Sequence, residues 1–238
     1  KAIEAVRRLR TLVDEPVPQL VHYQCEQAEA ALRSREPNLS AAESALNEAE
    51  EAAKKLGEKG GSRASSARIF MLRAQLAKMN ADYPLQQFYL QEVLRIAPGY
   101  AGLIAADLMQ CFAQQNQSDQ GLAVLMAHYE RYPLIDVFAQ VFTALREQQG
   151  GEQAWRFARE ALEQSPSLLG LDRSLSVELQ YELSPAVQRI LGGDLSLLRS
   201  LVHRHTQRLD RYACQQCGFE AQHFYWQCPG CTHWESYA

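Results

Sequence analysis

Three prolines, Pro98, Pro133 and Pro166, each follow an amphipathic segment and lie 35 and 33 residues apart. The segments before them align as "FYLQEVLRIAP", "AVLMAHYERYP" and "WRFAREALEQSP". A period of about 34 residues, with two helices per unit and a proline after the second, is the tetratricopeptide spacing. Because one helix pair cannot bury its apolar face alone, successive pairs stack and share a core. The spacing therefore predicts a helical-repeat solenoid.

The positions inside one unit agree with this period. If Ala67 is the first position, the small residue expected at the eighth is Ala74, and Pro98 closes the unit. The twentieth position, usually alanine, holds Gln86 here and Gln120 in the next unit, so we expect degenerate repeats. Their first helices should line a concave groove that holds segments of partner proteins. The sequence does not single out partner-binding residues in it.

Helical periodicity extends over residues 1–209, in which Ala, Leu, Glu, Gln and Arg are abundant. We expect an inter-helix loop at residues 57–66, "GEKGGSRASS". Residues 1–12 read as the second helix of a repeat whose first helix is missing. The chain starts at Lys1 and shows no signal peptide, so we expect a fragment of a longer protein.

Composition excludes several classes of protein. With 47% hydrophobic and 22% charged residues, the chain reads as an ordinary globular protein. Its formal net charge of −4 argues against a general nucleic-acid binder. No apolar run reaches the roughly 20 residues that cross a bilayer. No phosphate loop or paired-carboxylate motif is present, so we predict that the chain is not an enzyme.

The segment 196–211, "SLLRSLVHRHTQRLDR", is predicted to be the last helix before the cysteines. It is locally basic, and a nucleic-acid contact is one interpretation of its charge. The favoured interpretation is an amphipathic connector that buries Leu197, Leu198, Leu201 and Val202.

Four of the six cysteines lie close together near the end, in two Cys-x-x-Cys pairs. Two such turns chelate one tetrahedral metal ion, and four thiolates fill its shell. Cys214, Cys217, Cys228 and Cys231 are therefore predicted metal ligands. Mixed ligation through His223 or His233 is an alternative, as are a redox pair and two disulfides. The other two cysteines, in apolar helical segments, are predicted to be buried.

Sulfur ligation alone does not separate zinc from iron, since both occupy tetrahedral four-thiolate sites. We expect one ion, with zinc favoured over iron, at a closed and non-catalytic site. A module of this size cannot fold on apolar burial alone and depends on its metal. Aromatic residues near the cysteines are predicted to pack around it: Tyr212, Phe219, Tyr225, Trp226 and Trp234. We assign residues 1–209 to the repeats and residues 210–238 to the metal-binding module.

Helical repeats followed by the pattern "YxCxxCGFxAxxxYWxCPxCxxW" resemble the lipopolysaccharide assembly protein B (LapB) family. The matching residues are Tyr212, Cys214, Cys217, Gly218, Phe219, Ala221, Tyr225, Trp226, Cys228, Pro229, Cys231 and Trp234. The resemblance implies an all-α repeat domain joined to a rubredoxin-like knuckle that packs against it.

The resemblance also implies a function. Members are anchored in the inner membrane of Gram-negative bacteria by one N-terminal helix, absent here, and face the cytoplasm. The implied role is that of an adaptor in the regulation of proteolysis. It promotes degradation, by the membrane AAA protease FtsH, of the deacetylase that commits precursor to lipid A synthesis. An inner-membrane lipopolysaccharide sensor opposes it, and these three proteins are the expected partners.

Two departures concern the end of the chain. The family's tail beyond the tryptophan is longer than "ESYA". Thr232 follows Cys231, where rubredoxin electron carriers have glycine, which weighs against electron transfer. The alternative functions are an electron-transfer module with a rubredoxin-type iron site and a repeat region associated with a glycosyltransferase.

Overall fold

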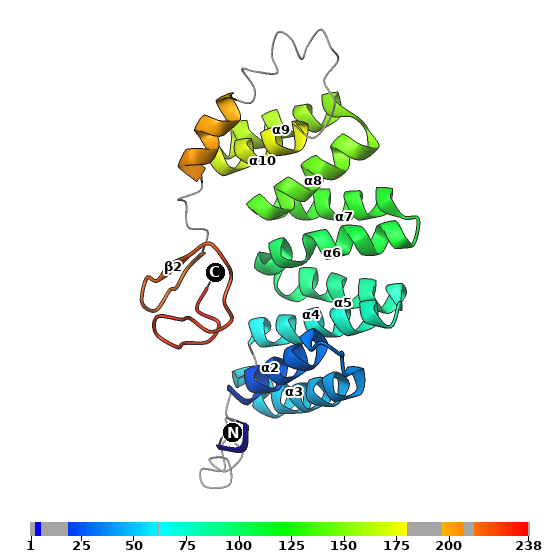
Figure 1. Cartoon of the computed structure of the whole chain (residues 1–238), viewed down its shortest axis with the longest axis vertical. Coiled ribbons are helices and arrows are strands. Elements are labelled where there is room, and N and C mark those ends of the chain that lie inside the picture. The colour runs from blue at the N-terminus through cyan, green and yellow to red at the C-terminus, as the bar shows by residue number, and fades with distance from the viewer. Residues whose placement is uncertain (1–2, 6–18, 61, 180–196, 207–211, 238) are drawn as a thin grey trace. The chain divides into compact units, whose positions relative to one another are not determined.

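The computed structural model describes residues 3–5, 19–60, 62–179, 197–206 and 212–237 (Figure 1). They form two compact units. The first, the N-terminal unit, holds Lys1–Asn116 together with the short segment Thr232–Glu235. The second, the C-terminal unit, holds Gln117–Cys231 and Ser236–Ala238. Four residues near the end of the chain therefore belong with the N-terminal helices.

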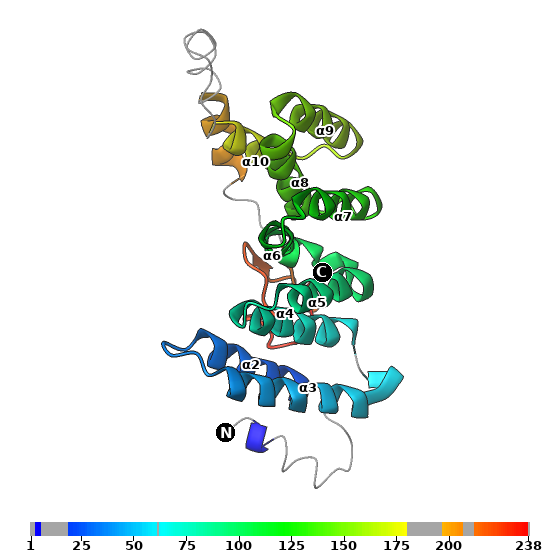
Figure 2. The ribbon, with the colours of Figure 1, turned by 90° about the vertical axis from the view of Figure 1, so that its right-hand side faces the viewer.

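The N-terminal unit is built from helices joined by short turns. In chain order its elements are α2 (Gln19–Arg33), α3 (Leu39–Gly60), α4 (Arg63–Met79), α5 (Tyr83–Ile96), the 3₁₀ turn η1 (Pro98–Tyr100) and α6 (Ala101–Gln114). Helix α2 packs on α3, and α4 packs on α5 and also on α2 (Figures 1 and 2). Helix α2, the first helix of its pair, thus touches its own second helix and the first helix of the next pair, as in a tetratricopeptide array.

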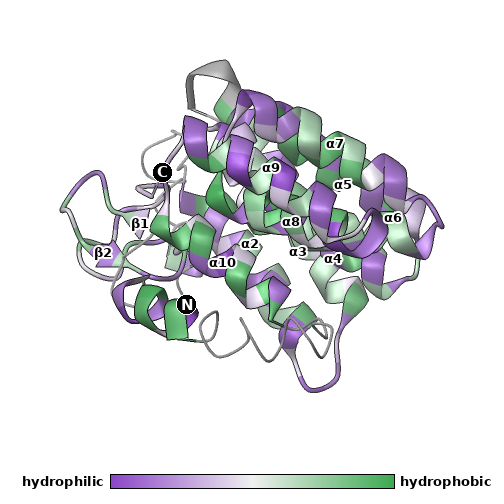
Figure 3. Cartoon of the chain, turned by 90° about the horizontal axis from the view of Figure 1, so that it is seen from above, coloured by the Kyte–Doolittle hydropathy of each residue, from purple (hydrophilic) through white to green (hydrophobic). Residues whose placement is uncertain are grey.

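The C-terminal unit repeats this pattern and adds two short strands. Its elements are α7 (Ser118–Arg131), α8 (Ile135–Gln148), α9 (Gly151–Gln164), α10 (Leu168–Glu178), a helix at 197–206, β1 (Tyr212–Ala213) and β2 (Glu220–Ala221). Helix α8 packs on α7, α9 and α10. Hydrophilic and hydrophobic residues occupy different sides of the helices (Figure 3). The predicted all-α repeat fold, followed by a cysteine knuckle, is confirmed.

Local sequence explains where the helices begin. The side chain of Ser62 accepts a hydrogen bond from the Ser65 amide at the start of α4. Asp82 accepts one from Leu85 at the start of α5, and Ser167 caps α10 in the same way. Each satisfies an amide that the first turn of a helix leaves unpaired. The three periodic prolines follow α5, α7 and α9, as their spacing predicts.

Burial refines the assignment of repeat positions. Gln86 at the twentieth position is 2% exposed, so it occupies a core site. In the next unit Gln120 is exposed, whereas Gly121 is buried. Counting back from Pro133 places Gly121 at the twentieth position, because the 35-residue interval contains one extra residue. The assignment of Gln120 was wrong by one residue.

Two further expectations are corrected. The loop predicted at 57–66 is shorter, because α3 continues to Gly60 and α4 begins at Arg63. The leucines of the last helix, Leu197, Leu198 and Leu201, were expected to be buried, but all three are exposed. The predicted half-repeat at 1–12 and the boundary at 209–210 fall mainly or wholly outside the described residues.

The helix cores are made of alanines and branched apolar residues, together with the buried rings of Phe112, Phe138 and Phe142. Cys25 and Cys111 are buried, 0% and 1% exposed, which confirms their prediction as core residues. Among the residues that the structure describes, none of the helices combines the length and the hydropathy that crossing a bilayer requires.

Candidate metal centre and the adjoining tail segment

The backbone of the cysteine module folds around two tight turns. Strands β1 and β2 pair antiparallel, with Tyr212 opposite Ala221 and Ala213 opposite Glu220. The Cys214 amide donates to the carbonyl of Phe219 at 2.9 Å, and the Gly218 amide donates to the carbonyl of Cys214 at 2.8 Å. These bonds close the first Cys-x-x-Cys turn at the end of the hairpin.

The tail of the chain completes this backbone. The Gln215 amide donates to the carbonyl of Ser236 at 2.7 Å, and Cys214 forms an isolated antiparallel bridge with Tyr237. Residues on both sides of the segment 232–235 are thus held by the module: Cys231 before it and Ser236 after it. Ser236 and Tyr237 therefore have a structural role that the sequence alone did not indicate.

The four sulfurs converge on one point. The Sγ atoms of Cys214, Cys217, Cys228 and Cys231 all lie within 4.8 Å of one another. The Cys214–Cys231 and Cys217–Cys228 distances are both 3.7 Å. A tetrahedral ion with metal–sulfur bonds of about 2.3 Å requires edges of about 3.8 Å. All four cysteines are free, and disulfide sulfurs would be about 2.05 Å apart. The chain therefore contains a four-cysteine site of the right size for one metal ion.

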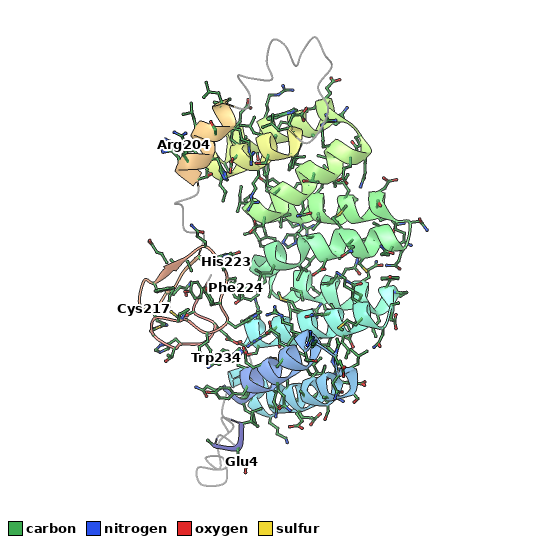
Figure 4. All side chains as sticks on the ribbon, viewed as in Figure 1. Glu4, Arg204, Cys217, His223, Phe224 and Trp234 are labelled. Atoms are coloured by element: carbon green, nitrogen blue, oxygen red, sulfur yellow. The ribbon has the colours of Figure 1, made fainter. Side chains whose placement is uncertain are left out.

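The predicted ligands are the ones that the fold brings together. Among the described residues, these four cysteines are the group of three or more histidine, cysteine or acidic side chains that lie close enough to share an ion. His223 and His233 do not belong to it, so the arrangement does not favour mixed ligation. Figure 4 shows Cys217 on this module, apart from the labelled Phe224 and His223.

Hydrogen bonds favour the thiolate form at two of the cysteines. Burial raises the pKa of Cys214, but hydrogen bonds from Ser236 and from the amides of Cys217 and Gln216 outweigh it and lower that pKa to about 6. The pKa of Cys228 is also lowered, because backbone amides in its own turn overcome the effect of burial. The amides thus prepare two sulfurs for metal binding, since the thiolate is the form that ligates.

A third sulfur behaves differently. A hydrogen bond from the Phe219 amide lowers the pKa of Cys217, but burial and the neighbouring sulfurs of Cys214 and Cys228 outweigh it, and the pKa is raised. Charge already present at one sulfur opposes charge at the next. A bound cation removes this conflict because it attracts all of the thiolates at once. The donor set therefore fits a metal ion.

Each Cys-x-x-Cys turn is followed by a residue with left-handed backbone. Gly218, after Cys217, has φ of 72°, and Thr232, after Cys231, has φ of 62°. Glycine adopts this conformation without strain, whereas a β-branched residue does so at a cost. The two turns thus share one backbone form even though threonine replaces glycine in the second.

Aromatic side chains form the small core beside the sulfurs. Tyr237 is 2% exposed and groups with Cys214 and Cys228, with Tyr212 and Phe224 packed against them. Phe224 lies edge-on to Tyr212 at 5.6 Å and to Trp226 at 4.9 Å between ring centroids. Two of the predicted packing residues are more peripheral, since Phe219 is 41% and Tyr225 40% exposed.

Trp234 makes its contacts in the N-terminal unit, beside α2 (Figure 4). Its indole stacks on the imidazole of His22, with centroids 4.5 Å apart and planes 6° from parallel. Tyr23 meets the same indole edge-on at 5.8 Å. The guanidinium carbon of Arg68, on α4, lies 5.7 Å from the ring centroid. The indole is thus held between the first helices of two successive pairs.

Glu235 adds charged contacts at the same place. Its Oε1 lies 2.9 Å from Nε2 of His22 and accepts a hydrogen bond from the Ser65 hydroxyl. Burial raises the pKa of this carboxyl, but hydrogen bonds from His22, Ser62 and Ser65, together with the charge of His22, lower it to about 2. Glu235 is therefore ionised at neutral pH and anchors the segment 232–235 to α2 and α4.

The residues of α2 and α4 that contact Trp234 and Glu235 were not predicted from the sequence. His22 is 3% exposed and Arg68 1% exposed, which is unusual for ionisable side chains. Arg68 also pairs with Glu29 at 3.1 Å and with Glu26. A histidine and an arginine at core-facing positions of "LVHYQC" and "SARIFML" were the available signals. Nothing in the sequence paired either of them with Trp234.

Comparison with known proteins agrees with the site and extends beyond it. Residues 212–237 match the family described as the rubredoxin metal binding domain. Over 237 residues, 99% of this chain, the sequence is 24% identical to lipopolysaccharide assembly protein B of Escherichia coli K12. Over 169 residues, 71% of this chain, it is 27% identical to the protein of that name from Haemophilus influenzae. The chain spans 57% of the first relative's length and 42% of the second's. The resemblance predicted from the terminal motif is confirmed.

Proposed function

We propose that this chain, a relative of the lipopolysaccharide assembly protein B family, acts in lipopolysaccharide assembly as a non-enzymatic adaptor. The observation that carries the proposal is the joint presence of repeat helices and a four-cysteine site in a chain related to those proteins over nearly its whole length. Repeat arrays bind segments of other proteins along the surfaces of their first helices. Recognition is therefore the activity that this architecture favours.

The proposed partners follow from the family resemblance. The adaptor would bring the lipid A pathway deacetylase to the membrane protease FtsH, and an inner-membrane lipopolysaccharide sensor would oppose it. The chain would work at the cytoplasmic face of the inner membrane of a Gram-negative bacterium, anchored by a helix outside these residues. What supports this part of the proposal is the name of the relatives and the repeat fold.

The metal ion has a structural task in this proposal. Cys214, Cys217, Cys228 and Cys231 would hold one zinc ion, which cross-links the two turns and replaces the large apolar core that so short a module lacks. The four sulfurs leave no position for a substrate, which supports a structural ion rather than a catalytic one. By fixing both turns, the ion also fixes the residues on either side of the segment 232–235.

The identity of the metal has a direct test. Elemental analysis of the purified chain should give one zinc per chain, and the protein should be colourless. Iron bound by four cysteines would give a coloured protein with thiolate charge-transfer absorption. A coloured, iron-loaded chain that cycles reversibly between two oxidation states would support the electron-transfer alternative instead.

The adaptor role is tested by the turnover of the deacetylase in cells of a Gram-negative bacterium that depend on this protein. After protein synthesis is stopped, the half-life of the deacetylase should be short with the wild type and several-fold longer with C214S/C217S. The matched control is Cys111→Ala, which removes a cysteine outside the site and should leave turnover unchanged. Normal turnover with C214S/C217S at equal abundance would refute a role for the cysteine module.

A further inference from the structure

The helix at 197–206 is attached to α10 by its polar residues. Asp172 of α10, 5% exposed, accepts a hydrogen bond from the Thr206 hydroxyl at 3.0 Å and lies 2.9 Å from Nδ1 of His203. Arg199 donates to the hydroxyl of Ser176 at 3.1 Å. At 100° per residue, positions 199, 203 and 206 share one side of a helix. This side faces α10.

The opposite side of the same helix carries leucines. Leu197, Leu198 and Leu201 are 58%, 46% and 48% exposed. Arg204 and His205 are exposed beside them, and Arg204 lies on the outer side of this helix in Figure 4. We call these five residues the leucine face. An amphipathic helix at a protein surface normally turns its leucines inward. This helix instead exposes its leucines together with Arg204 and His205, and it turns Arg199, His203 and Thr206 toward α10.

Buried Asp172 explains why the orientation is kept. Turning the helix to bury the leucines would remove the Thr206 and His203 contacts from a buried carboxylate. A buried carboxylate that loses its hydrogen-bond donors is destabilised, because no water replaces them. The three leucines therefore stay exposed because the polar attachment fixes the helix, and not because the sequence lacks apolar residues.

The helix at 197–206 is the last helix in the described part of the chain, and this indicates what could cover the leucine face. In a repeat array each helix pair is covered by the next, and the last one normally presents a polar outer surface. Here the exposed side of the helix at 197–206 carries three leucines, with Arg204 and His205 beside them. A helix that continues the stacking would need leucine-like residues toward this face and acidic residues opposite Arg204 and His205.

We propose that the leucine face binds an amphipathic helix of a partner protein, with an apolar stripe and an acidic flank. The stripe packs on Leu197, Leu198 and Leu201, and the acidic flank pairs with Arg204 and His205. This inference deepens the proposed adaptor function by adding a docking surface. It rests on the leucine face and not on the cysteine site, so the two can fail separately.

The test uses synthetic helical peptides of about 18 residues, long enough for five turns. One set carries leucines at helical spacing with glutamates on the flank, and a second set differs only in having lysines there. Binding to the intact chain is measured by fluorescence anisotropy. We expect the glutamate set to bind, and L197S/L201S to weaken binding at least tenfold.

Two controls make the result specific. Leu85→Ser changes a leucine of α5 that is 41% exposed and should leave binding unchanged. R204E should reverse the preference, so that the lysine peptides bind several-fold better than the glutamate peptides. Because all of the altered side chains are exposed, circular dichroism should show unchanged helix content in each variant.

Several outcomes would overturn the proposal. These are no binding by any glutamate-flanked peptide, equal binding by L197S/L201S, and equal affinity for the two flank charges. Concentration-dependent self-association that L197S/L201S abolishes would assign the face to a second copy of the chain. Sedimentation with anionic vesicles without peptide binding would assign it to a membrane surface. Loss of deacetylase turnover in C214S/C217S with normal peptide binding would leave this inference standing.

Discussion

The indole of Trp234 stacks on the imidazole of His22 at 4.5 Å, although the two residues lie near opposite ends of the chain. The same indole lies under the guanidinium of Arg68, and the next residue, Glu235, reaches His22 and Ser65. A segment that directly follows the last cysteine is thus part of the N-terminal unit. The segment that contacts α2 and α4 therefore begins at the residue directly after the last cysteine.

Replacing the indole should weaken the N-terminal unit. Trp234→Ala removes the stacking on His22 and the contact with Arg68, and we expect it to lower the free energy of unfolding by about 2 kcal/mol. Chemical denaturation followed by circular dichroism at 222 nm measures the effect. Phe88→Ala, at a residue that is 55% exposed, is the control and should change stability by less than about 0.5 kcal/mol. Equal midpoints for the two variants would show that the stacking contributes nothing.

The contribution of Glu235 should depend on pH. Its pKa is lowered from 4.5 to about 2, so its stabilising effect is complete above pH 4.5 and is lost as the pH falls toward 2. Glu235→Gln should cost about 1–3 kcal/mol at pH 7, and this difference from the wild type should shrink below pH 4.5. Denaturation of both proteins at several pH values measures it. Acid also releases a thiolate-bound metal from both proteins, so only the difference between them reports the carboxylate. A difference that is the same at pH 7 and pH 3 would contradict this assignment.

The six thiols should react in two groups. Burial raises the pKa of Cys25 to about 12 and also raises that of Cys111, so neither forms a reactive thiolate in the folded protein. In the metal-loaded chain we expect little alkylation at pH 8. A chelator should expose the four clustered cysteines, and a denaturant should then expose the remaining two. Mass spectrometry counts the modified residues. Alkylation of Cys25 as fast as Cys217 after chelation would be inconsistent with the buried core.

The left-handed turn at Gly218 should tolerate no side chain without cost. An added Cβ meets no atom within 4 Å, so the effect of Gly218→Ala is purely conformational at φ of 72°. We expect about 1–2 kcal/mol of strain and weaker metal binding by about tenfold. Gly99→Ala is the matched control, since Gly99 also has open space but no left-handed φ. Competition for zinc with a chromophoric chelator measures the affinities. Equal zinc affinities for the two variants would contradict the strain argued for Gly218→Ala.

Much of the fold could be predicted from the sequence because local sequence patterns specify helical repeats. Apolar residues three and four positions apart define each helix, and the prolines that follow α5, α7 and α9 mark the ends of the pairs. The four cysteines were identified by spacing alone, because a tetrahedral shell accepts only a few ligand patterns. These features depend on residues close together in the chain.

Only the tertiary structure decided which distant residues meet. The sequence offered Trp234 as an aromatic beside the cysteines, but its partners His22 and Arg68 belong to helices at the other end of the chain. Likewise, periodicity identified the leucines of the last helix, but the contacts of Asp172 turned them outward. Periodicity shows that a helix has two faces, whereas the choice of the buried face depends on the groups that another element presents. A buried carboxylate must keep its hydrogen bonds, and here that requirement outweighed the burial of three leucines.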